Sequence, residues 1–200
     1  MKKKKRVVFI QYIILGIIAV IFIVPMLWLF LASINPSASA GISLPKNPTL
    51  DNYLAVFTNK DNLRGFANSF YMSILTSVVT VIVSMLAAYP LSRYKLRGKA
   101  KFLYIILFMT SLPINAILVP VFKMFITLNM QDNLVSIALF MAATNLPYGI
   151  WMTKNFMDSV PVTLEEAAKV DGAGASAVLR RVIMPLMKPG IFTVLIYVFT

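Results

Sequence analysis

The residues of this chain that could do chemistry are concentrated in one short segment, EEAAKVDGAGASAVLRRVIMPL, at residues 165–186. The segment holds three of the seven acidic side chains of the chain, Glu165, Glu166 and Asp171, and a pair of arginines. The 200 residues include no cysteine and no histidine, which excludes thiol nucleophiles, Cys/His metal sites and an imidazole general base. We therefore predict no catalytic residue, no metal and no cofactor.

The small residues GAGAS, at residues 172–176, could be interpreted as a phosphate cradle. A phosphate-binding loop of that kind follows a strand and ends in Gly-Lys-Ser or Gly-Lys-Thr, and neither feature is present. No nucleotide site is therefore predicted in this chain.

The first half of the segment predicts a short, capped helix. The run TLEE at residues 163–166 has the form of a capping box, in which Glu166 reaches back to the threonine amide. Acidic residues in a first turn also interact favourably with the helix dipole. We expect a helix from Leu164 to Asp171 that ends at Gly172.

The second half predicts a second helix with one apolar face. Ser176 can begin this helix, which is expected to finish before Pro185. The apolar face is formed at i, i+3, i+4 spacing by Val178, Leu179, Val182 and Ile183, opposite Arg180 and Arg181. The predicted element lies along a membrane surface, and a loop that only meets anionic lipid through its basic residues remains an alternative.

The surrounding elements are those of a membrane protein. Hydrophobic residues make up 59% of the chain and charged residues 13%, about half of the ~25% that is typical of soluble domains. A helix needs ~20 apolar residues to cross a bilayer. The apolar runs predict an all-α polytopic membrane protein with about five helices, at residues 7–31, 66–91, 102–122, 134–154 and 189–200.

The two terminal runs need separate interpretation. Ala38-Ser39-Ala40 fits a signal-peptide cleavage site, but the run at 7–31 is longer than the ~7–15 residues of a signal-peptide core. We therefore favour an uncleaved first helix, kinked by Pro25. The run at 189–200 is too short to cross a bilayer, and we expect the fifth span to be truncated.

Two of the inner runs carry further signals. The run at 66–91 contains Ser, Thr, Ala and Asn residues of the kind that let membrane helices approach closely, so we expect it to be buried in a bundle. The run at 102–122 is expected to be broken by Pro113 and Pro120.

The distribution of positive charge predicts the topology. Residues 1–6, 92–101 and 154–188 hold fifteen of the nineteen Lys and Arg residues, which predicts that these parts are cytoplasmic. The basic tail 1–6 and the 158–188 segment are then inside, and the loop 32–65, with a short amphipathic piece, is external. The basic residues flank apolar runs and lack interleaved aromatics, so the net charge of +12 does not indicate a nucleic-acid partner.

The 166–185 segment resembles the "EAA" loop of permease subunits in binding-protein-dependent ABC importers. That loop reads Glu-Ala-Ala, three residues, Gly, nine residues, Ile, one residue, Leu-Pro, and here the spacing is intact. The matching residues are Glu166, Ala167, Ala168, Gly172, Val182, Met184 and Pro185, with Val182 and Met184 in place of Ile and Leu. Runs such as NLPYGIWMTKNFMDSVPVTLEEAAKVDGA are similar to the carbohydrate-uptake branch, and to the second permease subunit of maltose-type systems.

The resemblance implies a type I ABC importer transmembrane fold in the cell membrane. It implies as partners a cytoplasmic ABC ATPase dimer, a second permease subunit that is a different chain, an external solute-binding protein and the lipid bilayer. In that family the loop docks on the ATPase, which hydrolyses the ATP. For this chain, the resemblance implies that Glu166 contacts the ATPase, together with the neighbouring Ala167, Ala168 and Asp171. Glu165 would carry part of that contact if Glu166 caps its own helix.

The solute pathway is less well marked. Polar or amphipathic side chains near membrane depth usually face a cavity, and the candidates are Asn115, Asn145, Tyr148 and Trp151. Asn145 with Pro147 could equally serve a helix kink, and the aromatic residues could be interfacial anchors. A permease for amino acids, peptides or a metal chelate, and a membrane protein whose loop recruits some other partner, remain alternative functions.

Overall fold

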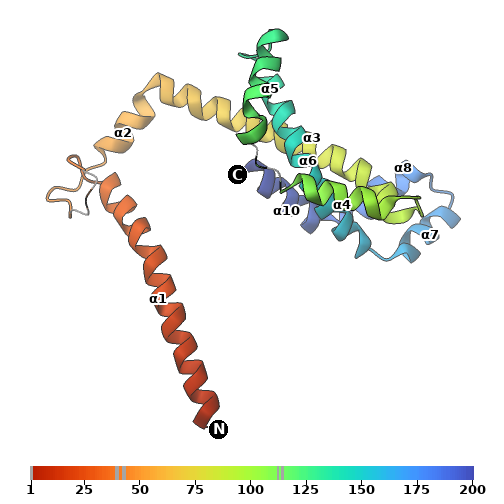
Figure 1. Ribbon diagram of the computed structural model, residues 1–200, viewed down its shortest axis with the longest axis horizontal. Coiled ribbons are helices and arrows are strands. Elements are labelled where there is room, and N and C mark those ends of the chain that lie inside the picture. Colours follow the sequence, from red (N-terminus) through yellow and green to blue (C-terminus); the bar gives the residue numbers. More distant parts are fainter. Residues whose placement is uncertain (1, 39–40, 42–43, 112, 114) are drawn as a thin grey trace. The chain divides into compact units, whose positions relative to one another are not determined.

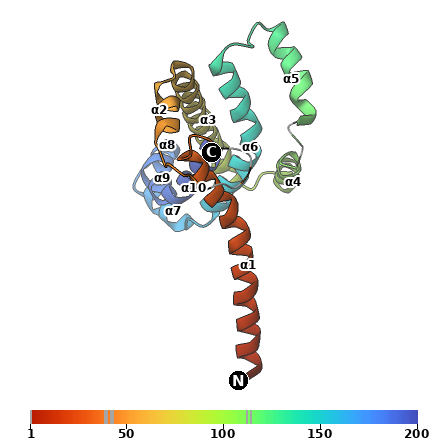
Figure 2. The same ribbon diagram turned by 90° about the vertical axis from the view of Figure 1, so that its left-hand side faces the viewer.

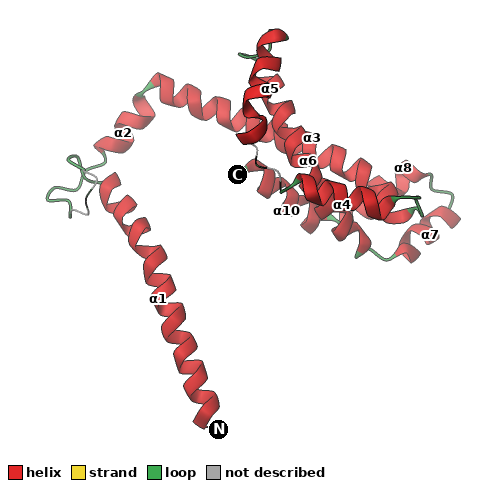
Figure 3. Ribbon diagram, in the orientation of Figure 1, coloured by secondary structure: helices red, strands yellow, loops and turns green. Residues whose placement is uncertain are grey.

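The chain is helical throughout its regular elements. The computed structural model describes residues 2–38, 41, 44–111, 113 and 115–200, and within these residues every regular element is a helix (Figure 3). The all-α prediction is therefore confirmed. The chain divides into two compact units, Met1–Phe66 and Ala67–Thr200.

The first unit contains α1 (Lys2–Ser33) and α2 (Asp51–Thr58) (Figure 1). α1 passes through Pro25 as one helix. The amphipathic piece expected in the 32–65 loop forms α2, and its Asn52 Nδ2 donates to the carbonyl oxygens of Ser33 and Asn35, at 3.1 Å each. These bonds fasten α2 to the end of α1. Ser39 and Ala40 of the possible cleavage site lie outside the described residues.

The second unit contains most of α3 and all helices that follow it. The long helices are α3 (Lys60–Arg93), α4 (Lys99–Met109), α5 (Asn115–Thr127), α6 (Leu134–Asp158) and α10 (Lys188–Phe199). Within this unit α6 contacts both α4 and α10, and it lies beside α3 (Figure 2). Residues 162–186, here named the α7–α9 segment, comprise α7 (Val162–Val170), α8 (Ala175–Val178), the π-helical turn η1 (Leu179–Ile183) and α9 (Met184–Leu186).

Among the residues that the structure describes, three helices are long and apolar enough to cross a membrane. They cover Val8–Ser33, Lys60–Arg93 and Leu134–Asp158, and a fourth crossing is counted if the helical stretch Ala175–Leu186 and α10, bent by 78°, form one span. The run at 102–122, expected to be broken by Pro113 and Pro120, forms two shorter helices, α4 and α5, which end and begin on either side of Pro113. Pro120 lies inside α5 without ending it, because a helix tolerates the loss of one backbone bond where neighbours compensate.

Small and polar residues let α3 and α6 approach closely, as the composition of the 66–91 run predicts. Thr76 Oγ1 donates to the carbonyl oxygen of Ala138 across the two helices, at 3.2 Å. A Cβ built on Gly149 of α6 would stand 2.4 Å from Ser84 Oγ of α3, so a larger residue at this crossing would force a shift of the Ser84 side chain or of the helices. The prediction of a bundle-facing α3 is confirmed by its buried polar face, which includes Thr76, Ser77, Thr80 and Ser84.

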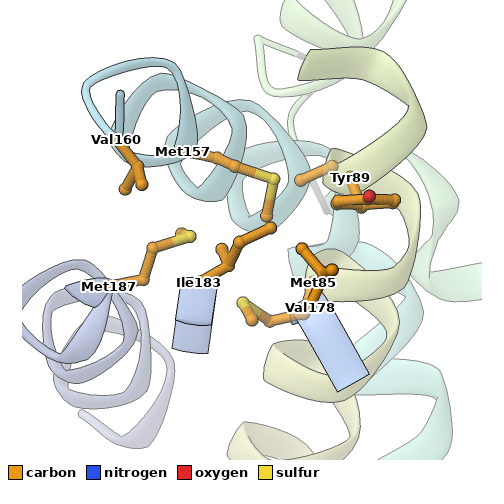
Figure 4. Packing of buried hydrophobic residues seen from close by; sticks show 8 residues of the cluster. Met85, Tyr89, Met157, Val160, Val178, Ile183 and Met187 are labelled. Atoms are coloured by element: carbon orange, nitrogen blue, oxygen red, sulfur yellow. The ribbon is translucent and has the colours of Figure 1, made fainter. Parts of the chain in front are cut away.

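The largest apolar cluster joins the α7–α9 segment to the ends of α3 and α6. Its buried members converge from α3, from the last turn of α6 and the link that follows it, from α8 and η1, and from the residue before α10 (Figure 4). They are Met85, Ala88, Tyr89, Met157, Val160, Val178, Ile183 and Met187. The segment is therefore packed onto the helix ends and does not hang free as a loop.

Candidate functional site

α7 begins earlier than the sequence predicts, and it has no capping box. The helix starts at Val162 after Pro161, and no side chain caps its first turn. Pro161 has φ −59°, close to the helical value, so the chain can enter the helix there and Thr163 falls inside it. The predicted bond from Glu166 back to Thr163 is therefore wrong. Glu166 is exposed, and among the described residues it has no hydrogen-bond or ion-pair partner.

The end of α7 is built as predicted, on Gly172. This residue has φ +85°, a left-handed conformation that glycine adopts without strain. Its N–H donates to the carbonyl oxygen of Lys169 at 3.0 Å, and the N–H of Ala173 donates to that of Ala168 at 2.9 Å. These two bonds form a Schellman motif, and Ala168 and Ala173 both pack against the apolar cluster.

The second helical stretch does not finish before Pro185. Helical backbone continues from Ala175 through the π turn η1 to Leu186, with Pro185 inside it. In η1 the N–H of Met184 donates to the carbonyl oxygen of Leu179, five residues earlier. Widening the helix in the turn before a proline relieves the clash of its ring with the preceding carbonyls, which explains why the helix continues.

The apolar face of this stretch is as predicted. Val178 and Ile183 are fully buried, and Leu179 and Val182 are partly buried beside them. Arg180 and Arg181 are exposed on the other side. The predicted 3.6-residue period therefore identifies correctly which side of the α7–α9 segment packs inward.

Glu165 lies in the interior and not on the surface. Its side chain is 1% exposed, and its Oε1 accepts a hydrogen bond from Nε of Arg93, at the last residue of α3. The expectation that Glu165 could share a surface contact with Glu166 does not fit this placement, because its carboxylate is already bound. Successive helical residues are ~100° apart, so Glu165 faces the core while Glu166 faces outward.

Arg93 is the centre of a polar network that the sequence did not reveal. Its Nη2 donates to the carbonyl oxygen of Val160 at 3.0 Å, and its Nη1 donates to Ser92 Oγ at 3.1 Å. Ser92 Oγ in turn donates to Asp158 Oδ1 at 2.6 Å, and Lys154 pairs with the other oxygen of Asp158 at 2.5 Å. The sequence signal was only that Arg93 belongs to a basic loop, since its acidic partner lies 72 residues away.

The outer side of α7 carries apolar side chains around Glu166. Val162 and Val170 lie four residues before and after Glu166 on the same side of α7, and both are exposed, Val170 to 88%. Leu164 and Ala167 are exposed on other sides of the helix. Beside them lies an open recess of ≈ 490 Å³ lined by Ala168, Asp171, Gly172, Ala173, Gly174, Ala177, Arg181 and Val182. Of the remaining candidates, Asp171 and Pro185 are exposed and Val182 is half-buried. This surface suits a protein partner that offers a basic group to Glu166 and apolar side chains around it.

The four candidate pathway residues do not form one site. Asn145 lines a recess of ≈ 230 Å³ with Ser69, Ser73 and Thr76, although its Nδ2 donates to Met141 of its own helix. Tyr148 stacks on Tyr197 of α10 with ring centroids 4.0 Å apart.

The other two candidates lie elsewhere. Trp151 packs against a second apolar cluster, formed by the buried residues Leu91, Ile106 and Ile150. Asn115 is exposed at the start of α5, and within the described residues no hydrogen bond joins it to the other three. In the part of the chain that the structure describes, no three acidic residues gather as a metal site would need.

The sequence matches a known protein family over more than half of its length. Residues 80–200 match the family described as "Binding-protein-dependent transport system inner membrane component". The chain is 31% identical to the sulfoquinovosyl glycerol transport system permease protein SmoH of Agrobacterium fabrum over 92% of its length. It is also 31% identical to the galactooligosaccharides transport system permease protein GanQ of Bacillus subtilis, over 90%.

Among solved structures, the chain resembles that of a bacterial ABC transporter involved in the import of the acidic polysaccharide alginate. The TM-score is 0.80 at 25% identity, over 100% of this chain and 71% of the other. The chain spans 66% of the length of SmoH and 65% of that of GanQ. With more than half of its residues matched by the family, it belongs to the binding-protein-dependent transport system inner membrane components, and is a multi-pass membrane protein.

Proposed function

We propose that this chain is a membrane-spanning permease subunit of an ABC importer for a sugar or oligosaccharide. The observation that carries the proposal is the family match over 80–200 together with an intact Glu-Ala-Ala…Gly spacing on an exposed helix. The names of the relatives support the solute class, since they include permeases for sulfoquinovosyl glycerol, galactooligosaccharides and maltodextrin. No observation favours amino acids or peptides.

In this proposal the α7–α9 segment is the contact to a cytoplasmic ATPase, which hydrolyses ATP while this chain does not. Glu166 is exposed and has no partner within the described chain, so it is available to a basic group on the ATPase. Val162 and Val170 lie on either side of it with exposed apolar area, which a docked partner would remove from water. Gly172 fixes where this helix ends.

The proposal also assigns partners and orientation. A second permease subunit, expected to be a different chain, completes the pathway, and an external solute-binding protein delivers the solute. It places the N-terminus in the cytoplasm, and the fifteen Lys and Arg residues in 1–6, 92–101 and 154–188 support this orientation. The side of each loop is testable by thiol labelling in intact cells, since the chain has no native cysteine to interfere.

The test reverses the charge at the proposed contact. Glu166→Arg is expected to remove the ATPase from the purified complex and to abolish solute uptake into vesicles. Asp132→Arg is the matched control, because Asp132 is also an exposed acid but lies between α5 and α6. Unchanged assembly and unchanged uptake with Glu166→Arg would refute the assignment. The ligand of the external receptor that binds the vesicles identifies the solute.

A further inference from the structure

A buried ion pair connects the α7–α9 segment to the end of α3. The side chains of Arg93 and Glu165 are 7% and 1% exposed, and they lie next to the apolar cluster that also holds the segment. Apolar contacts are non-directional, so packing alone would let α7 rotate or slide on the helix ends. A hydrogen-bonded ion pair fixes both distance and direction.

One guanidinium reaches three successive parts of the chain. Through its Nε it binds Glu165 in the first turns of α7, and through its Nη2 it binds the carbonyl of Val160, in the link between α6 and α7. Through Ser92 it is connected to Asp158, at the end of α6. The planar fork of an arginine can satisfy these directions at once, whereas a lysine ammonium presents a point charge.

Glu165 is also adjacent to the residue proposed to contact the ATPase. Glu166 faces outward from the same turn in which Glu165 faces inward. A force applied to Glu166 therefore acts on a helix turn that is fastened directly to Arg93. One peptide unit joins Glu166 to Glu165, and one ion pair joins Glu165 to Arg93 at the end of α3.

We propose that Arg93 is a positioning residue that transmits movement of α7 to the ends of α3 and α6. This inference rests on the proposed function, and it adds a role for a residue outside the 158–188 segment. The bond network makes α7, the 159–161 link and the two helix ends move as one body. Loss of the network leaves α7 able to dock but unable to carry the helices with it.

The test separates this role from a merely structural one by replacing both charges with apolar side chains. A buried ion pair can often be exchanged for apolar residues of similar volume without loss of stability. In the complete transporter, Arg93→Met with Glu165→Met is expected to retain the ATPase while ATP hydrolysis stimulated by the loaded solute receptor falls at least about fivefold, the lower end of ordinary allosteric coupling. Arg93→Lys should recover part of that stimulation, because it restores the charge without the fork.

Arg97→Met is the matched control, since Arg97 is exposed in the loop that follows Arg93 and should leave stimulation unchanged. Stimulation of the double variant within about twofold of the original chain would overturn the inference, as would loss of the ATPase from the double variant, which would show a role in assembly instead. An unmodified chain that binds no ATPase refutes the proposed function itself. If the unmodified chain supports normal receptor-stimulated ATP hydrolysis and the double variant supports it equally well, only the role of Arg93 is refuted.

Discussion

Substitution of Gly172 by alanine tests whether the end of α7 must be held in its left-handed turn. Gly172 has φ +85°, and a Cβ added there would meet no atom within 4 Å. The cost is therefore confined to the backbone and amounts to about 1–2 kcal/mol for a left-handed non-glycine residue. That energy lowers the population of the capped turn, relative to an uncapped one, by about 5–30-fold.

The chain supplies a matched control for this substitution. Gly98, before α4, has φ +79° and likewise has no atom within 4 Å of an added Cβ. Gly98→Ala therefore carries a similar backbone strain, and both variants share the same gain from a less flexible unfolded chain. The two substitutions differ in location, because only Gly172 terminates the helix that carries Glu166.

The assay is a titration of the purified ATPase onto the permease pair held in lipid nanodiscs. If the partner binds only the capped form, the apparent affinity falls with the fraction of that form, up to about 5–30-fold for Gly172→Ala. Gly98→Ala should bind like the original chain, and Gly172→Asn should lie between them because asparagine tolerates the left-handed turn. Equal affinities for Gly172→Ala and Gly98→Ala would show that the left-handed turn at Gly172 is not needed for the ATPase to bind.

Three further substitutions test the helix packing that supports the site, each by thermal unfolding of the purified complex. Gly190→Ala places a Cβ 2.4 Å from Cγ of Phe156 and should destabilise by about 1–3 kcal/mol, because the ring base cannot move aside. Gly149→Ala should also destabilise, and adding Ser84→Ala should recover part of the loss by removing the Oγ that stands 2.4 Å away, while Thr80 Cγ2 remains at 3.0 Å; no recovery would contradict the packing. Gly65→Ala, inside α3 with open space around it, should be neutral or stabilise by up to about 1 kcal/mol.

The sequence predicted most features that depend on periodicity and composition. The 3.6-residue spacing of Val178 and Ile183 identified the buried face of the α7–α9 segment, and Gly172 was correctly placed at the end of α7. Both features follow from local preferences of the backbone and from the need to bury apolar area. The helical class follows because only helices satisfy every backbone group within such long apolar runs.

The failures concern features that depend on a distant contact or on proline geometry. Nothing near Glu165 in the sequence distinguishes it from Glu166, and its burial is decided by Arg93, 72 residues earlier. Because α7 begins directly after Pro161, Thr163 lies inside the helix and the predicted capping box does not form. The π turn lets the second helical stretch continue through Pro185. A proline restricts the backbone, but the surrounding helix decides whether it ends, begins or only widens there.

The central claim, that α7 docks on a cytoplasmic ATPase, is tested most directly by cross-linking. Because the chain has no cysteine, Ala167→Cys introduces a unique and exposed thiol beside Glu166. Ala100→Cys, exposed in the first turn of α4, is the control on the same predicted side of the membrane. We expect a short thiol-directed cross-linker to join Cys-substituted α7 to the ATPase in the assembled transporter, with little product from the control. Equal yields from both positions, or none from α7, would contradict the account.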